Sequence, residues 1–178
     1  MAFDTKRVQL VDDGGNPLGT ALKSAVHGID TPLHLAFSCH VYSRAGGFLM
    51  TRRALAKRTW PGVWTNAFCG HPAPGEPIED AVRRHARNEL GLELAELAVV
   101  LPEFRYRARD ASGIVENEIC PVFRALAASE ISPSPDEVCE TQWTDVESVR
   151  TAVTVAPYAF SPWLRMQLQE LQGQTEST

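Results

Sequence analysis

The chain has 178 residues, of which 44% are hydrophobic and 22% charged, and its net charge is −5. We expect one domain spanning residues 1–178, with its core at about residues 8–170. The negative charge disfavours binding to nucleic acid or to an anionic membrane surface. No apolar segment approaches the roughly 18 residues that span a bilayer, and the amino terminus lacks the apolar stretch of a signal peptide.

Four cysteines stand singly in the sequence, and none belongs to a C-x-x-C pair. They are Cys39, Cys69, Cys120 and Cys139. In a chain without an export signal, this spacing indicates reduced thiols and a cytoplasmic location rather than a disulfide framework. Two of them lie in apolar strand-like segments, where cysteine behaves as a small buried hydrophobic residue.

Extended segments separated by turns make up most of the chain. A Gly-Gly-Asn-Pro turn joins two short extended segments near the amino terminus, and an Arg-Ala-Gly-Gly turn joins two strands of a hairpin. The longer predicted strands are residues 33–43, 48–51, 97–106, 114–126 and 141–144.

Two helices interrupt these strands. The first runs from Pro77 to Leu90, and the second starts at Ser161-Pro162 and continues to about Leu171. The polar tail, residues 173–178, is expected to be disordered. Strands that alternate with helices in this way predict a mixed α/β domain.

The first predicted helix carries a carboxylate on its apolar face. At about 100° per residue, Ile78, Val82 and Ala86 form one inward stripe, and Glu89 falls about 20° from it. A buried carboxylate must be paired, protonated or bound to a cation. Glu89 is therefore either part of a salt bridge or a metal ligand. His85 lies on the same face, either as a core residue or as a ligand.

One basic cluster departs from the acidic balance of the chain. Arg52, Arg53, Lys57 and Arg58 fall within seven residues. Such a run is most often a solvated surface. A phosphate group on a substrate would give it a binding function.

The first helix and the loop before it resemble the Nudix box, G-x5-E-x7-R-E-U-x-E-E-x-G-U, where U is an apolar residue. The matching residues are Gly70, Glu76, Arg84, Ala86, Glu89, Gly91 and Leu92. Two positions differ, since His85 and Asn88 replace two of the glutamates that gather magnesium in a Nudix hydrolase. One remaining carboxylate suits a single Mg²⁺ and equips hydrolysis poorly. The box therefore indicates a Nudix-type α/β/α sandwich with a mixed sheet and a diphosphate ligand, but a different chemistry.

The sequence from about Val8 to about Gln169 resembles the type I isopentenyl diphosphate isomerases, a family with the Nudix fold. The resemblance rests on several short motifs that occur in the family's order. They are Lys23 with His27, His34-Leu35-Ala36-Phe37, Thr51-Arg52-Arg53-Ala54, Trp60-Pro61-Gly62-Val63-Trp64-Thr65-Asn66, Cys69-Gly70-His71-Pro72, Tyr106-Arg107-Ala108, Glu116-Asn117-Glu118 and Ser161-Pro162-Trp163. The resemblance implies an enzyme that interconverts isopentenyl diphosphate and dimethylallyl diphosphate in isoprenoid biosynthesis.

The resemblance also implies a transition-metal site. Its five ligands would be His27, His34, His71, Glu116 and Glu118. The two glutamates are two residues apart in an extended segment and so share one face of a strand, whereas the histidines can join them only through the fold. Without the resemblance, each of these residues is more commonly a surface side chain. Three imidazoles and two carboxylates suit Mn²⁺, Zn²⁺ or Fe²⁺.

The implied reaction adds a proton to an alkene, passes through a tertiary carbocation and removes a proton elsewhere. It needs an acid and a base on opposite faces of the substrate, and water must be excluded. By resemblance, Cys69 exchanges a proton at one face, and Glu118, assisted by Tyr106, serves the other. Trp163 resembles the family's aromatic cap over the cation, although a tryptophan at a helix start is as often a core residue.

The diphosphate end of the substrate would be bound by one Mg²⁺ and several basic side chains. By resemblance, the Mg²⁺ ligands are Glu89 and the backbone carbonyl of Cys69. The residues that match phosphate-contacting positions of the family are Lys23, Arg53 and Lys57. Relatives usually carry an arginine at the position of His85, which here either faces the core or contacts phosphate when protonated.

Two other functions remain open at this point. A Nudix hydrolase of a diphosphate would leave Cys69, Glu116 and Glu118 without a role. A catalytically silent metal- or ligand-binding module would leave the set of Cys69, Tyr106 and Glu118 unexplained. The expected partner is a small isoprenoid diphosphate rather than a nucleic acid or a membrane, and both a monomer and a homodimer are compatible with the sequence.

Overall fold

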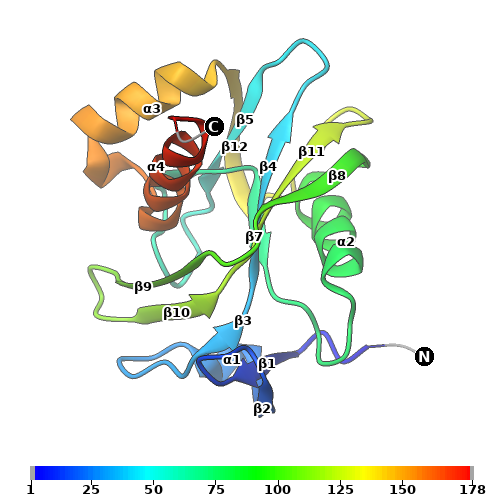
Figure 1. Ribbon diagram of the computed structural model, residues 1–178, viewed down its shortest axis with the longest axis vertical. Helices are drawn as coiled ribbons and strands as arrows, with labels where there is room; N and C mark the ends of the chain where they lie inside the picture. Colours follow the sequence, from blue (N-terminus) through cyan, green and yellow to red (C-terminus); the bar gives the residue numbers. More distant parts are fainter. Residues whose placement is uncertain (1–2, 177–178) are drawn as a thin grey trace.

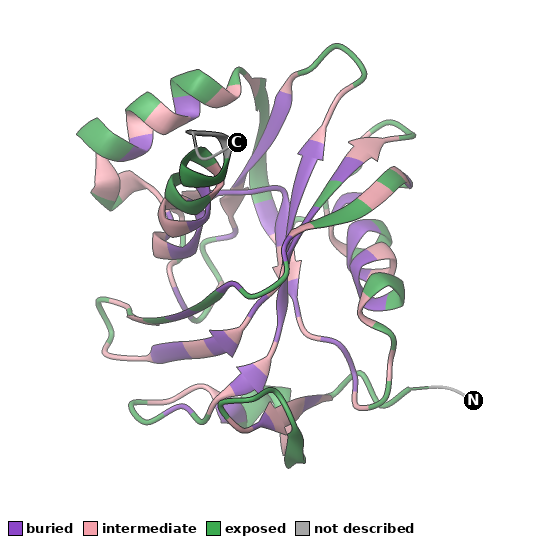
Figure 2. Ribbon diagram, viewed as in Figure 1, coloured by how far each residue is buried: buried purple, intermediate pink, exposed green. Residues whose placement is uncertain are grey.

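A seven-stranded sheet is the framework of the protein. The computed structural model describes residues 3–176 (Figure 1). The sheet has the order β12-β5-β4-β11-β8, with β6 paired to β5 and β7 paired to β4. These strands are β4 (Phe37–Tyr42), β5 (Phe48–Arg53), β6 (Trp64–Thr65), β7 (Phe68–Gly70), β8 (Leu94–Leu101), β11 (Val122–Ala127) and β12 (Val138–Thr144). Figure 2 shows that β4 and the strands beside it are buried along much of their length.

A second sheet of five strands lies at one end of the first. Its order is β2-β1-β3-β10-β9. The strands are β1 (Arg7–Val11), β2 (Pro17–Leu22), β3 (His34–Leu35), β9 (Arg105–Arg109) and β10 (Val115–Ile119). Both sheets are mixed, because β3 pairs with β10 and β4 pairs with β11 in parallel, whereas most of the other pairs are antiparallel.

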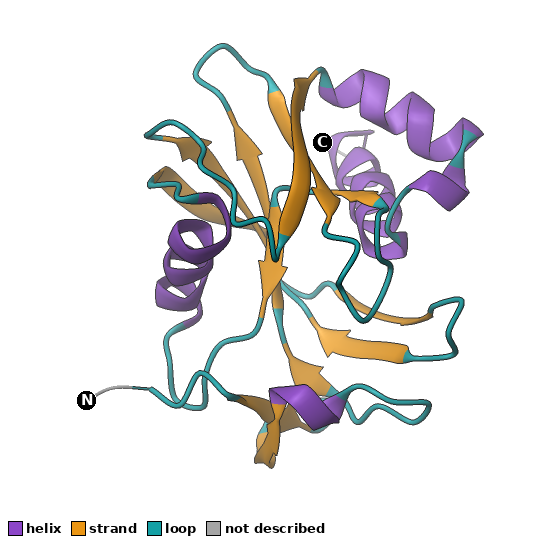
Figure 3. Ribbon diagram, turned by 180° about the vertical axis from the view of Figure 1, so that it is seen from behind, coloured by secondary structure: helices purple, strands orange, loops and turns teal. Residues whose placement is uncertain are grey.

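Helices cover both faces of the larger sheet. The helices are α1 (Lys23–Val26), α2 (Ile78–Leu90), α3 (Val146–Val155) and α4 (Pro162–Glu176), and a 3-10 turn spans Pro157–Ala159. Figures 1 and 3 show α2 on one face and α3 with α4 on the other. Alternation along β5 serves both layers, since Leu49 packs into the α2 core while Phe48 and Met50 pack with α3 and α4. The expected α/β/α sandwich with a mixed sheet is confirmed.

The helix α2 has the boundaries that its sequence predicts to within one residue. Its first turn carries two acidic residues, which favour a helix amino terminus, and Gly91 ends it in the left-handed conformation with φ 58°. The Gly91 amide donates a hydrogen bond to the carbonyl of Arg87. The predicted inward stripe is buried at Val82 and Ala86, and Ile78 is half-buried at its start.

Three predicted strands are each two strands that lie in different sheets. One is the predicted strand at residues 97–106, which divides at residues 102–104 into β8 and β9. The predicted strand at residues 33–43 divides at Ala36 into β3 and β4, and the one at residues 114–126 divides at Cys120-Pro121 into β10 and β11. The divisions at Ala36 and at Cys120-Pro121 lie side by side, because the Ala36 amide bonds the Ile119 carbonyl and the Ser38 amide bonds the Pro121 carbonyl. Hydrophobic alternation continues across such a crossing, so the pattern did not predict it.

Two further differences concern helices. The helix α3 was not predicted, because its sequence is rich in Val and Thr and its start depends on the Asp145 side chain, which accepts a hydrogen bond from the Ser148 amide. The expectation of disorder from residue 173 is wrong as far as Glu176, since α4 continues to that residue. The rest of the expected tail, residues 177–178, lies outside the described residues. None of the helices described combines the length and the apolar character needed to cross a bilayer.

Candidate active site

A pocket of about 170 Å³ opens between the two sheets and the start of α4. All the predicted site residues except His34 line it, and His34 lies fully buried directly behind His71. The fold therefore brings together side chains from α1, β5, β7, α2, β9, β10 and α4 and from the loops between elements. His85, whose role was open, does not line this pocket.

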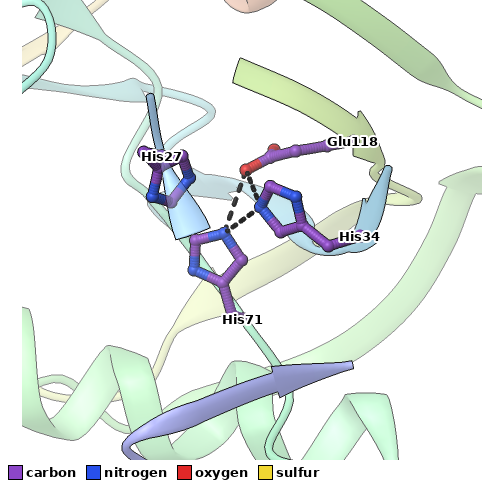
Figure 4. Close-up of side chains that lie close together, drawn as sticks. All are labelled: His27, His34, His71 and Glu118. Atoms are coloured by element: carbon purple, nitrogen blue, oxygen red, sulfur yellow. Dashed lines mark hydrogen bonds and ion pairs between the residues drawn. The ribbon is translucent and has the colours of Figure 1, made fainter. Parts of the chain in front are cut away.

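Three histidines and a carboxylate form a compact cluster at one side of the pocket. Ligand atoms of His27, His34, His71 and Glu118 all lie within 4.8 Å of one another (Figure 4). The His71 Nε2 atom is 3.0 Å from Glu118 Oε1 and 3.2 Å from His34 Nε2. His34 and Glu118 face each other because they are register partners in the parallel pair β3–β10.

The fifth predicted ligand, Glu116, joins the cluster through His27. Its Oε2 atom lies 2.8 Å from His27 Nε2, although the ring is not oriented for a hydrogen bond. The other oxygen of Glu116 accepts a hydrogen bond of 2.9 Å from the Thr59 hydroxyl. Thr59 thus fixes the orientation of the carboxylate, a role that the sequence did not suggest.

The hydrogen-bonding atoms of the cluster fit a divalent cation. His34 Nδ1 donates to the Pro32 carbonyl at 2.9 Å, so in the neutral ring its Nε2 lone pair faces the centre. Glu118 Oε1 is a second acceptor at that centre. His71 Nε2 lies near both acceptors but carries at most one hydrogen, so it can donate to only one of them. His27 Nε2 and His71 Nδ1 are buried and make no hydrogen bond with any described residue. A cation would satisfy several of these acceptors at once.

Burial and the neighbouring groups set the charge of His71 and Glu118. Burial lowers the pKa of His71 to about 3, so its imidazole is neutral at physiological pH. Burial alone would raise the pKa of Glu118, but its contacts with His34 and His71 hold it well below its usual range. Although burial opposes it, the same carboxylate raises the pKa of His34. A neutral imidazole beside an ionised carboxylate is a combination that coordinates a metal ion.

The thiol of Cys69 projects into the pocket from β7. Its Sγ atom lies 3.0 Å from the Ser38 hydroxyl and 3.5 Å from Asn66 Oδ1. Ser38 is its register partner across β4–β7, so the strand pairing sets this contact. Burial raises the pKa of the Cys69 thiol to about 12, although both hydrogen-bond partners act in the opposite direction. The resting group is therefore a protonated thiol.

Aromatic rings form the wall next to these groups. Tyr106 is the register partner of Glu118, and burial raises its pKa well above 10, so its phenol is neutral. The ring centroids of Tyr106 and Trp163 are 5.8 Å apart. The indole nitrogen of Trp163 donates to Thr65 Oγ1 at 2.9 Å, which holds this ring in place. Rings placed in this way can stabilise a cation in the pocket.

Basic side chains gather at the other end of the pocket. These are Lys23, Arg53, Lys57 and Arg58. The guanidinium of Arg53 donates to the carbonyls of Thr59 and Trp60 and lies 5.4 Å from the Trp163 ring centroid. Lys57 pairs with Glu137, another carboxylate on the pocket wall that the sequence did not single out. This positive end suits a phosphate group.

The helix α2 supplies Glu89 to the same pocket, and His85 holds it. His85 Nδ1 lies 2.5 Å from Glu89 Oε1, and the His85 ring packs edge-on against Phe37 with centroids 5.3 Å apart. Of the two alternatives left open for His85, its buried position matches a core residue that contacts Glu89. The expected stripe of α2 thus ends in a histidine–glutamate pair rather than in a salt bridge to arginine.

The other two matching polar residues of the box, Glu76 and Arg84, pair with each other behind the site. Arg84 donates two hydrogen bonds to the Glu76 carboxylate, at 2.8 and 2.6 Å, and a third to the His71 carbonyl at 3.3 Å. Glu76 also accepts from the Ala73 amide at 2.8 Å. The pair therefore fixes the loop that carries His71.

Gly70 is required by its contact with His85, and its replacement gives a testable result. A Cβ atom at this position would lie 2.5 Å from the His85 ring. We expect Gly70→Ala to lower the free energy of unfolding by about 1–3 kcal/mol, as overpacking does, measured by urea denaturation. Adding His85→Ala should recover much of this loss. Gly28→Ala is the control, because nothing lies within 4 Å of its added Cβ. Equal stability of Gly70→Ala and the unchanged protein would contradict this packing argument.

Comparison with known proteins agrees with this geometry. The NUDIX domain model matches residues 32–164. An isopentenyl-diphosphate Delta-isomerase of Clavibacter michiganensis is 62% identical over 168 residues, which cover 94% of this chain and 87% of the relative. The enzyme of the same name from Klebsiella pneumoniae is 50% identical, with 92% of this chain and 89% of the relative covered.

Solved structures share the fold at low sequence identity. A crystal structure of a Deinococcus radiodurans protein has a TM-score of 0.73 at 18% identity and covers 93% of this chain and 98% of its own. A NUDIX hydrolase from Burkholderia pseudomallei has a TM-score of 0.58 at 23% identity, with 77% and 96% covered. The family match over most of the chain, together with relatives at 50–62% identity, shows that the chain belongs to the NUDIX domain family and, within it, to the isopentenyl-diphosphate Delta-isomerases.

Proposed function

We infer that the protein is an isomerase that interconverts isopentenyl diphosphate and dimethylallyl diphosphate and so serves isoprenoid biosynthesis. One observation carries the mechanistic part of this proposal. Cys69 and the pair of Glu118 with Tyr106 line a single small pocket that has an aromatic wall and a basic end. A five-carbon chain with a diphosphate has the matching shape, with its alkene among the aromatic rings and its phosphates among the lysines and arginines.

The proposed reaction consists of one protonation and one deprotonation of the substrate. An acid on one face adds a proton to the terminal alkene carbon, and the double-bond electrons form the new C–H bond. The resulting tertiary carbocation is stabilised by the rings of Tyr106 and Trp163. A base on the opposite face then removes a proton from the neighbouring carbon, and that C–H bond becomes the new double bond.

Cys69 and Glu118 are the groups proposed to exchange protons with the substrate, one on each face of its carbon chain. The neutral phenol of Tyr106 lies beside Glu118 in the strand pairing and can donate a hydrogen bond when the carboxyl group exchanges its proton. Glu118 and Tyr106 are buried, which keeps water from the cation. After each turnover the acid must regain a proton and the base must lose one, and the reverse reaction exchanges these roles.

A transition metal is part of this proposal. The ligands would be His27, His34, His71, Glu116 and Glu118, and their donor set suits Mn²⁺ or Zn²⁺. When bound, such an ion would supply positive charge that adjusts the proton affinity of the Glu118 carboxyl group. Thr59 would orient Glu116, and Pro32 would orient His34, for this purpose.

The diphosphate would bind at the basic end of the pocket with one Mg²⁺. Glu89 and the backbone carbonyl of Cys69 would be its protein ligands, and the phosphate oxygens would contact Lys23, Arg53 and Lys57. Glu89 is the one carboxylate of α2 that lines the pocket, and it is itself bonded to His85, so the set of glutamates that a hydrolase needs is incomplete. The four cysteines are free thiols, which supports our proposal that the enzyme works in the cytoplasm.

Solvent exchange tests the reaction. Incubation of the purified protein with isopentenyl diphosphate in deuterated water should yield dimethylallyl diphosphate with deuterium in the newly formed methyl group, detected by NMR and mass spectrometry. Release of free phosphate would instead indicate a hydrolase, and recovery of unchanged substrate would indicate a silent binding module. Product without solvent deuterium would rule out the protonation mechanism.

A further inference from the structure

A chain of buried hydrogen bonds leads from Cys69 away from the pocket, and the mechanism above does not use it. The Ser38 hydroxyl lies 3.0 Å from Cys69 Sγ, Gln167 Nε2 lies 2.9 Å from that hydroxyl, and His40 Nε2 lies 2.9 Å from Gln167 Oε1. Ser38, His40 and Gln167 are each no more than 1% exposed. The chain crosses from β4 to α4, on the face of the sheet opposite α2 (Figure 3).

These residues occupy positions where apolar side chains would be less costly to bury. Ser38 and His40 alternate with Phe37, Cys39 and Val41 along β4, whose other face packs against α2. On α4, Gln167 stands beside the fully buried Leu168. A buried polar group costs free energy unless it is hydrogen-bonded. In this network His40 Nδ1 is buried without a hydrogen-bond partner among the described residues, whereas the His40 Nε2 atom and both polar ends of the Gln167 amide are bonded.

The directions of two of these hydrogen bonds follow from the donor inventory. Gln167 Oε1 can only accept, so His40 must donate from Nε2, and the Gln167 amide nitrogen then donates to Ser38 Oγ. Since Gln167 occupies one lone pair of Ser38 Oγ, the hydroxyl hydrogen is available to donate to Cys69 Sγ, 3.0 Å away.

The second polar neighbour of the thiol is Asn66. Its amide nitrogen donates to the carbonyls of Cys39 and Phe68, at 3.0 and 2.8 Å, and lies 3.4 Å from Cys69 Sγ. Its Oδ1 atom lies 3.5 Å from the sulfur and also accepts from Thr65 Oγ1 and from the indole nitrogen of Trp163. Asn66 is thus held beside the sulfur by its bonds to other groups.

We propose that Gln167, acting through Ser38 and backed by His40, is a positioning residue that fixes the direction of the hydrogen bond to the sulfur of Cys69. The hydroxyl hydrogen supports the sulfur after the thiol has given up its proton. The role in turnover depends on the proposed function, whereas the orientation of the S–H group does not.

The test combines infrared spectroscopy with kinetics. The S–H stretching band of Cys69 in the ligand-free protein is obtained by subtracting the spectrum of Cys69→Ala. We expect Gln167→Met and Ser38→Ala to shift this band and to lower kcat about tenfold, the effect of one hydrogen bond, with KM changed by less than about twofold. Ser38→Thr keeps the hydroxyl and should restore both the band and kcat.

Leu164→Ala is the matched control for damage to the packing of α4. Leu164 is fully buried on the same helix but packs with Phe48 and Met50, away from the thiol. It should lower stability while leaving the S–H band and kcat near their original values. Ser38→Ala removes one atom and keeps the test available if Gln167→Met does not fold.

Two outcomes would overturn the proposal. One is an S–H band that stays in place in both Gln167→Met and Ser38→Ala. The other is a shifted band with an unchanged kcat. Absence of isomerase activity in the unaltered protein would instead refute the proposed function. The two failures can be told apart, since the position of the S–H band reports whether Gln167 directs the hydroxyl even in a protein without activity.

Discussion

Replacement of Cys69 by alanine is expected to lower kcat by about 10²–10⁴-fold, the range of a general acid–base group. The thiol is the group at one face of the proposed carbocation, and a methyl group cannot give or take a proton. The fold should be retained, because Cys69 is a small half-buried residue in the middle of β7. Turnover measured by NMR with isopentenyl diphosphate, together with the circular dichroism spectrum, provides the test.

Another cysteine of the chain serves as the control for Cys69→Ala. Cys39 is fully buried in the core between α2 and the sheet, and its thiol contacts a backbone carbonyl rather than the pocket. Cys39→Ala should lower stability but leave kcat nearly unchanged. A loss of less than about tenfold in Cys69→Ala would mean that the Cys69 thiol only fills space.

Removal of His34 is expected to have the second large effect, loss of the transition metal that we propose for the histidine cluster. His34 is fully buried and its Nδ1 atom is bonded to the Pro32 carbonyl, so no solvent molecule can easily replace its ring. We expect His34→Ala to lower metal affinity by more than the 10–100-fold typical of an outer-shell partner, and to abolish turnover. The bound metal is measured by elemental analysis after gel filtration. Full occupancy in this variant would contradict the assignment.

Glu89→Gln should separate the second cation from the first. This variant removes an anionic oxygen from the proposed Mg²⁺ site, yet Glu89 is not among the residues of the histidine cluster. It should therefore retain the proposed transition metal while requiring a higher Mg²⁺ concentration for half-maximal activity. Loss of the transition metal from Glu89→Gln would show that the two sites are not independent.

The predictability of the fold differed from element to element. The helix α2 followed from its apolar spacing and its terminal glycine, which are local signals. The points at Ala36 and at Cys120-Pro121 where the chain passes from one sheet to the other could not be predicted. The alternation of side chains along a strand does not indicate which strand it pairs with. The helix α3 was missed since its β-branched residues favour strands, and its packing against α4 overrides that preference.

Site residues that belong to a sequence motif could be predicted, whereas residues that reach the site only through tertiary contacts could not. The family resemblance pointed to the cysteine, the histidines and the two glutamates that line or back the pocket. Thr59, Ser38 and Gln167 bear on these residues only through contacts between distant segments, and Thr, Ser and Gln have no distinctive pattern in a sequence. The His85–Glu89 bond is an intermediate case, since a spacing of four residues on a helix allows it but does not require it.

The parallel pairs β3–β10 and β4–β11 have a consequence for the order of assembly. Parallel strands cannot be joined by a tight turn, and pairing between distant segments is slow because the loop between them must first be closed. A nascent chain that has left the ribosome only as far as β9 can pair β3 with β1, but it has no partner for the other edge of β3 or for the edge of β4 that binds β11. His34 therefore acquires its neighbour Glu118 only when β10 arrives. The cluster of histidines and Glu118 is thus completed late in the synthesis of the chain.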